Sequence, residues 1–158
     1  MKIDIFIQTD THRIGYQKRV NAMYLISCAL RNGTVEERNG VVSLTDATSS
    51  QAALRALINA LEHFHKAAAI RLYISDNFVR NTLTNGNLNR WRDNGWQKKS
   101  GEIKNLELWK ETAQLLKDHI IEYAYGPELE HITLKKMEDK LNELRKEQAK
   151  ADLGEWDM

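Results

Sequence analysis

The chain has 158 residues and a formal net charge of +1, from 23 Lys and Arg against 22 Asp and Glu. Its length fits one domain whose core needs no disulfide or metal. The composition, with 42% hydrophobic and 28% charged residues, excludes a disordered chain. The near-neutral charge excludes a protein that is basic over its whole surface, so any nucleic-acid contact must come from a local patch.

Three strands are predicted first, over residues 2–9, 20–30 and 41–44. Isoleucine alternates with other residues in the first strand, which is typical of a strand with one face in a core. Asn32-Gly33 predicts a tight hairpin turn after the second strand, and Asn39-Gly40 predicts a bulge or turn before the third. These strands therefore form an antiparallel meander.

The remainder of the chain alternates helices with two further strands. Apolar residues at three- and four-residue spacing predict a helix over 51–65, and a helix capped by Asp76 ends at Asn85-Gly86. Helices are also expected on both sides of a loop at 97–103 and after Gly126-Pro127, with strands at 70–75 and 119–125. The last helix carries a narrow apolar stripe of Leu134, Met137, Leu141 and Leu144.

The order β-β-β-α-β-α-α-α-β-α predicts an α/β fold with a mixed five-stranded sheet. Three antiparallel strands are followed by two parallel ones, and helices flank the sheet. We expect a single domain over residues 1–150 and a polar C-terminal tail over 151–158.

Three of the four tryptophans lie within residues 91–109, which we call the tryptophan segment. They are interleaved with cations, and over residues 87–104 five cations face two acids, a local net charge of +3. Rings and cations in alternation favour a nucleic-acid strand, because cations meet phosphates and rings meet sugars or bases. The same tryptophans also suit a helical hairpin whose rings pack together, and we expect them to serve both purposes.

Cys28 is the only cysteine, which excludes a disulfide framework and a cysteine-based metal site and is typical of a reducing compartment. The first residues lack the basic region and apolar stretch of a signal peptide. No apolar run reaches the roughly 20 residues that span a bilayer. The sequence therefore predicts a cytoplasmic protein.

The tryptophan segment and the element order resemble type 1 ribonuclease H. Bacterial members carry W-x-x-x-G-W, a basic loop and V-K-N-x-x-L-W, where this chain reads Trp91-Arg92-Asp93-Asn94-Gly95-Trp96 and Ile103-Lys104-Asn105-Leu106-Glu107-Leu108-Trp109. Leu57-Ile58-Asn59-Ala60-Leu61-Glu62 resembles the first-helix pattern A-I-x-A-L-E of the family. Short ribonuclease H-like proteins of bacterial mobile elements look similar over the basic region. The resemblance implies a ribonuclease H-like fold and an RNA–DNA hybrid as ligand.

The family cleaves the RNA strand of a hybrid with two divalent ions, held by four carboxylates. Matched to this sequence, those four positions fall on Gln8, Ala53, Ser75 and Thr133. Amide, methyl and hydroxyl side chains are poor ligands for Mg²⁺ or Mn²⁺, so the resemblance predicts a chain with no resident metal, in which hydrolysis is lost or weak.

A displaced set of carboxylates is the alternative. Asp10 lies two residues beyond Gln8 and Asp76 is adjacent to Ser75, and Glu138 or Asp139 of the last helix could complete this set. This alternative predicts an active enzyme that uses Mg²⁺ or Mn²⁺. Each of these acids also has a structural interpretation, as a loop residue, an N-cap or part of a solvated helix face.

The family's phosphate-binding positions match Thr48 and Asn105, both of a suitable type. We therefore predict a nucleic-acid surface of three to five phosphate contacts, made by Thr48, Trp91, Arg92, Trp96, Lys98, Lys99, Lys104 and Asn105. A third hypothesis is a non-enzymatic scaffold that binds a protein partner, or a second copy, through the helix at residues 134–144.

Overall fold

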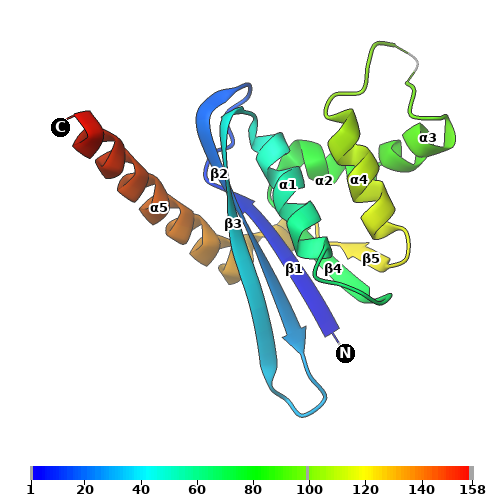
Figure 1. The fold of residues 1–158 in the computed structure, drawn as a ribbon. Coiled ribbons are helices and arrows are strands. Elements are labelled where there is room, and N and C mark those ends of the chain that lie inside the picture. The colour runs from blue at the N-terminus through cyan, green and yellow to red at the C-terminus, as the bar shows by residue number, and fades with distance from the viewer. Residues whose placement is uncertain (1, 99, 157–158) are drawn as a thin grey trace.

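The computed structural model describes residues 2–98 and 100–156 and holds one five-stranded sheet in the order β3-β2-β1-β4-β5 (Figure 1). Its strands are β1 (Lys2–Thr9), β2 (Gln17–Ala29), β3 (Val35–Ala47), β4 (Ala69–Ile74) and β5 (Ile120–Tyr123). The first three strands pair antiparallel, and β4 and β5 add in parallel. The predicted fold class and strand directions are confirmed.

Helices cover both faces of this sheet. They are α1 (Ser49–Leu61), α2 (Asn77–Thr84), α3 (Asn87–Asp93), α4 (Leu106–Leu116) and α5 (Ile132–Trp156), with a short 3-10 helix η1 (Gly126–Glu130) before α5. Because side chains alternate along a strand, Ile5 and Ile7 of β1 enter a core with α1 and α4, whereas Phe6 faces the core beneath α5. Figure 1 shows α5 alone on its side of the sheet.

The turn predicted at Asn39-Gly40 is wrong, because β3 runs unbroken from Val35 to Ala47. Gly40 pairs with Tyr24 in the ladder, and the ring of Tyr24 lies across it. A Cβ on Gly40 would come within 2.6 Å of that ring. The glycine therefore marks a close approach inside a strand.

The last helix differs from its prediction at both ends. The chain after Gly126-Pro127 forms η1 first, and α5 begins only at Ile132. At the other end α5 continues to Trp156, so the region predicted as a polar tail is helical over residues 151–156. No helix within the described residues is long and apolar enough to cross a membrane.

The apolar stripe of α5 packs against the chain's own sheet. Leu134, Met137 and Leu141 are each at most 3% exposed and lie in one core with Phe6 and Tyr73. A docking surface needs apolar side chains that are open to solvent. The prediction that this stripe is open to a partner or second copy is therefore wrong for Leu134, Met137 and Leu141, which close the α5 face of the domain, whereas Leu144 is partly exposed.

Candidate functional site

The tryptophan segment forms the junction between α3 and α4. Trp109 on α4 is fully buried, and the Trp91 ring meets it edge to face, with 6.1 Å between ring centroids. Trp96 is half-buried and has a positive φ of 65°, and its N–H donates to the carbonyl of Trp91. The packing role expected for Trp91 and Trp109 is therefore present in the structure.

Trp96 also lines a surface hollow of about 340 Å³ between the α3–α4 loop and α4. The other lining residues are Arg92, Lys110, Ala113, Gln114 and Lys117. One ring beside three cations can contact a sugar or base and its flanking phosphates. Lys110 and Lys117 were not predicted, although their spacing of seven residues on an amphipathic helix places them on one face.

The basic loop before α4 presents more cations. Lys98 and Lys104 are exposed. Lys99 lies outside the described residues. Lys98 follows Trp96, which lines the hollow, by two residues in the chain, so it adds an exposed positive charge close to it.

Two helix N-termini meet beside this surface. Thr48 caps α1: its Oγ1 accepts from the Gln51 N–H at 3.1 Å, and its own N–H donates to Gln51 Oε1 at 2.9 Å. Gln51 Nε2 then donates to Asn105 Oδ1 at 3.0 Å, and Asn105 is the N-cap residue of α4. Positions 48 and 105, far apart in sequence, are thus joined through one side chain. Helix N-termini with hydroxyl and amide groups offer donors to an anion.

The residues at the four positions matched to catalytic carboxylates are all buried or half-buried in the fold. Gln8 Nε2 donates to the Leu134 carbonyl at 3.1 Å, and its Oε1 accepts from the Thr9 N–H at 3.0 Å. Ala53 is fully buried in the core between α1 and the sheet. Ser75 Oγ is buried and has no hydrogen-bond partner among the described residues. Thr133 is half-buried, and its N–H donates to His131 Nδ1.

The displaced acids lie in three separate settings. The buried Asp10 carboxylate accepts from the N–H and Nδ2 of Asn21, and Arg145 Nε lies 3.6 Å away. Asp76 caps α2 through the Val79 N–H and also accepts from the hydroxyls of Ser49 and Ser50.

On α5 the remaining two candidates pair with Lys135. Its Nζ lies 3.9 Å from Glu138 and 3.5 Å from Asp139, and the Asp139 side chain is 62% exposed. Over residues 2–98 and 100–156, no three His, Cys, Asp or Glu side chains come together as a group that could hold a metal ion. The structure therefore does not gather Asp10, Asp76 and Asp139 into one site.

Comparison with known proteins identifies the family of this chain. The family model described as RNase H matches residues 5–128. The chain belongs to the RNase H family.

Individual relatives are distant. Ribonuclease H of Thermoanaerobacter sp. (strain X514) is 30% identical over 95 residues, which are 60% of this chain and 60% of that protein. Among solved structures, LC9-RNase H1, described as a type 1 RNase H with the type 2 active-site motif, superposes with a TM-score of 0.64 at 23% identity. That match covers 80% of this chain and 64% of the other. A foamy viral protease–reverse transcriptase in complex with RNA/DNA hybrid gives 0.58 at 17% identity, covering 77% of this chain and 17% of that one.

The residues at the RNase H carboxylate positions do not fit two divalent ions. Both ends of the Gln8 carboxamide are already hydrogen-bonded, and Ala53 has no ligand atom. At the carboxyl end of β4, the Arg80 guanidinium donates to the carbonyls of Ile74 and Ser75. A cation therefore already binds the backbone oxygens next to the Ser75 position, where a metal site requires negative charge.

Proposed function

We propose that this RNase H family member binds RNA–DNA hybrid, or a related nucleic acid, and that its two-metal hydrolysis is lost or weak. The observation that carries the proposal is the contact between Gln51 and Asn105. It holds together the two positions that the family uses for a DNA-strand phosphate, in a chain whose carboxylate positions hold no carboxylate.

A phosphate at this junction would meet donors of three kinds. The Thr48 hydroxyl, the backbone N–H groups of the first turns of α1 and α4, and the Asn105 amide are all neutral donors. The basic hollow around Trp96 lies next along the same chain segment and supplies cations and a ring for adjacent nucleotides. The contacts are to the backbone, so the proposed binding is independent of sequence.

The ligand class is also supported by a structural neighbour. The foamy viral enzyme of the same fold was solved with RNA/DNA hybrid. A foamy viral protease–reverse transcriptase was also solved with dsDNA, so hybrid and duplex DNA are tested side by side. With Cys28 as a free thiol, we place this activity in the cytoplasm.

The binding half of the proposal is tested with Asn105→Asp. This substitution keeps a short side chain that tolerates the left-handed backbone at φ 59° and can still accept from Gln51, but it sets a carboxylate against the phosphate. We expect affinity for a labelled hybrid at low salt to fall by about 10- to 100-fold, as the loss of one charge-assisted hydrogen bond predicts.

The matched control is Asn32→Asp, which makes the same charge change at an exposed position in the turn between β2 and β3, where the side-chain oxygen only accepts hydrogen bonds. It should leave affinity within about twofold of the wild type, since such a distant exposed charge is largely screened. Equal effects of the two variants, or no binding by the wild type, would overturn the proposal.

The hydrolysis half needs a hybrid labelled on the RNA strand, incubated with Mg²⁺ or with Mn²⁺. We expect the RNA strand to stay intact under conditions that cleave it with an active ribonuclease H. Cleavage that Asp10→Asn and Asp76→Asn both abolish would establish the displaced-carboxylate alternative instead.

A further inference from the structure

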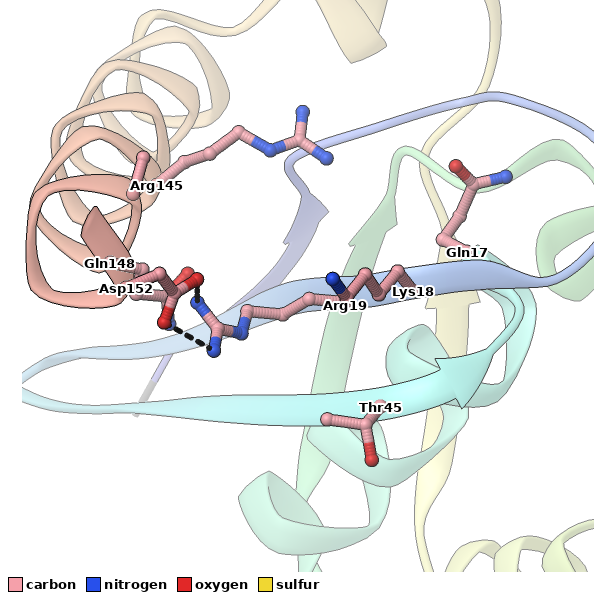
Figure 2. A pocket seen from close by; sticks show the side chains of 8 residues that line it. Gln17, Lys18, Arg19, Thr45, Arg145, Gln148 and Asp152 are labelled. Atoms are coloured by element: carbon pink, nitrogen blue, oxygen red, sulfur yellow. Dashed lines mark hydrogen bonds and ion pairs between the residues drawn. The ribbon is translucent and has the colours of Figure 1, made fainter. Parts of the chain in front are cut away.

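A second hollow of about 340 Å³ lies on the other face of the sheet, between β2, β3 and the C-terminal half of α5 (Figure 2). It is lined by Gln17, Lys18, Arg19, Thr45, Arg145, Gln148, Ala149 and Asp152. Three cations thus meet one acid around a space that the tryptophan segment does not reach. Apart from Ala149, each lining residue carries a polar or charged group at the end of its side chain, and aliphatic stems supply most of the lining surface.

The two arginines of this hollow are held in place by partners. Arg145 Nη1 donates to the Asp10 carbonyl at 3.4 Å, and its Nε faces the buried Asp10 carboxylate. Arg19 donates to both carboxylate oxygens of Asp152, at 3.3 and 3.5 Å, as the dashed lines in Figure 2 show. Their side chains remain 48% and 37% exposed, so both guanidinium groups have donors left for a ligand.

A polar row on the sheet fixes the floor beside these cations. Asn21 on β2 bonds the Asp10 carboxylate, and Gln148 on α5 exchanges two hydrogen bonds with the Asn21 side chain, at 2.9 and 3.1 Å. Gln148 also donates to Ser43 on β3 at 3.3 Å. These bonds tie α5 to the sheet, so the hollow is a preformed feature of the fold.

The position of the hollow relates it to the family's substrate path. Leu134 at the start of α5 contacts Gln8, which takes a catalytic position of the family. Arg145 lies eleven residues further along the same helix, which is about 16 Å. Along the axis of a duplex, the phosphates of one strand recur about every 3.4 Å. A duplex whose axis follows α5 would therefore advance by about five nucleotides between the Gln8 position and the hollow.

We propose that this hollow binds a backbone phosphate of the nucleic-acid strand that passes the Gln8 position. The inference rests on the proposed function and extends its contact surface to α5. Lys18, Arg19 and Arg145 contact the phosphate, and Asp152 competes with it for the guanidinium of Arg19. Binding therefore exchanges one carboxylate partner of Arg19 for a phosphodiester.

Charge distribution favours a strand as the source of this phosphate. The β1–β2 connection and the hollow together carry Arg13, Lys18, Arg19 and Arg145 against Asp10 and Asp152, a local net charge of +2. With the +3 of residues 87–104, the rest of the chain is net negative, since the whole carries +1. Two basic regions on an otherwise acidic molecule suit a ligand with charge at many points.

The test measures binding to a labelled hybrid of about 20 base pairs at low salt. Lys18→Glu should weaken binding by about 5- to 20-fold, because it reverses an exposed charge in the hollow. Asp152→Ala should strengthen binding by about threefold, because it removes the competitor for Arg19. Lys150→Glu is the control: it makes the charge change of Lys18→Glu on an exposed α5 residue that does not line the hollow, and it should have less than a twofold effect.

Two comparisons separate this inference from the proposed function. If the wild type binds no hybrid, the proposed function fails. The second comparison applies if the wild type binds hybrid and Asn105→Asp weakens that binding. If Lys18→Glu and Lys150→Glu then have equal affinity for the hybrid, and Asp152→Ala leaves the affinity unchanged, only the α5 contact is wrong. The substitutions at 18 and 152 should lose their effect on a hybrid of about 8 base pairs that ends before the hollow.

A titration with inorganic phosphate distinguishes a phosphate of a nucleic-acid strand from a free small anion as the ligand of this hollow. We expect inorganic phosphate to shift the NMR signals of the Arg19 and Arg145 side chains only at millimolar concentration, and the long hybrid to displace it. Saturation at micromolar phosphate without competition by the hybrid would show a site for a small anion, and would overturn the strand contact.

Discussion

Gln8 shows how a catalytic position of this family becomes a structural one. A carboxylate there would accept hydrogen bonds and bind a cation. The carboxamide instead donates to the Leu134 carbonyl and accepts from the Thr9 N–H, in a setting where the residue is 4% exposed. The side chain therefore ties the first turn of α5 to β1.

Substitution of Gln8 by Glu tests this role. The variant keeps the shape of the side chain but, at neutral pH, places a carboxylate against the Leu134 carbonyl with no proton to donate. We expect the free energy of unfolding in urea to fall by about 1–3 kcal/mol at pH 7, the cost of a buried polar group left unpaired. Gln97→Glu, at an exposed loop position, should change it by less than about 0.5 kcal/mol. Equal stability of both variants would show that the bond to Leu134 contributes little.

The match of Gln8, Ala53, Ser75 and Thr133 to the four carboxylate positions is a prediction from motif spacing. The partners of these residues cannot be predicted in this way. Nothing local to Gln8 indicates a bond to Leu134, 126 residues away, and nothing near Asp10 indicates Asn21 or Arg145. Such contacts depend on where α5 crosses the sheet, which periodicity does not specify.

At the scale of elements, strong local signals predicted best. The alternation in β1, the periodicity of α1 and the Asp76 cap of α2 each correspond to an element in the structure. The bulge or turn predicted at Asn39-Gly40 is wrong because the sequence does not distinguish a glycine in a turn from a glycine that lies under a neighbouring ring. The predicted start of α5 is wrong because Pro127 is compatible with the first turn of a 3-10 helix as well as of an α-helix.

The edge strand β5 carries Tyr123, whose phenol has a clearly raised pKa. Burial raises the pKa of the Tyr123 phenol to about 12 from its usual value of 10.0, because the charged phenolate loses water. The unfolded chain releases this proton near pH 10 and the folded chain near pH 12, so the folded state binds the proton more tightly between those values. The stabilisation is complete below pH 10 and is lost as the pH rises towards 12.

We therefore expect wild-type stability to fall more steeply than that of Tyr123→Phe between pH 10 and 12. Urea unfolding at pH 8 and pH 11 should show the gap between the two proteins change by about 1 kcal/mol or more in favour of the variant. Tyr125→Phe, which removes an exposed phenol just beyond β5, should follow the wild type. Parallel curves for all three proteins would contradict the assignment to Tyr123.

At the scale of the whole molecule, the net charge hides the charge distribution. A total of +1 excludes a broadly basic surface, yet the hollow at Trp96 gathers Arg92, Lys110 and Lys117, and the hollow beneath α5 gathers three more cations. In Figure 1 the tryptophan segment and α5 lie on opposite sides of the sheet, with the N-terminal end of α1 between them. Under the proposed function, a strand that contacts both passes the end of the sheet where α1 begins.

This arrangement predicts the salt dependence of binding. Each neutralised phosphate contributes about −0.9 to the slope of log affinity against log salt, and three to five contacts give a slope of about −3 to −5. Under the proposed function both residues contact backbone phosphates, so Lys110→Gln with Lys117→Gln should reduce the magnitude of this slope by about 2. The two substitutions should weaken binding to hybrids of unrelated sequence alike. The measurement is hybrid affinity between about 50 and 300 mM salt. Lys2→Gln with Lys66→Gln, two exposed cations outside α5 and outside both hollows, should leave the slope unchanged. A wild-type slope near zero, or an equal loss in both double variants, would contradict binding through these two surfaces.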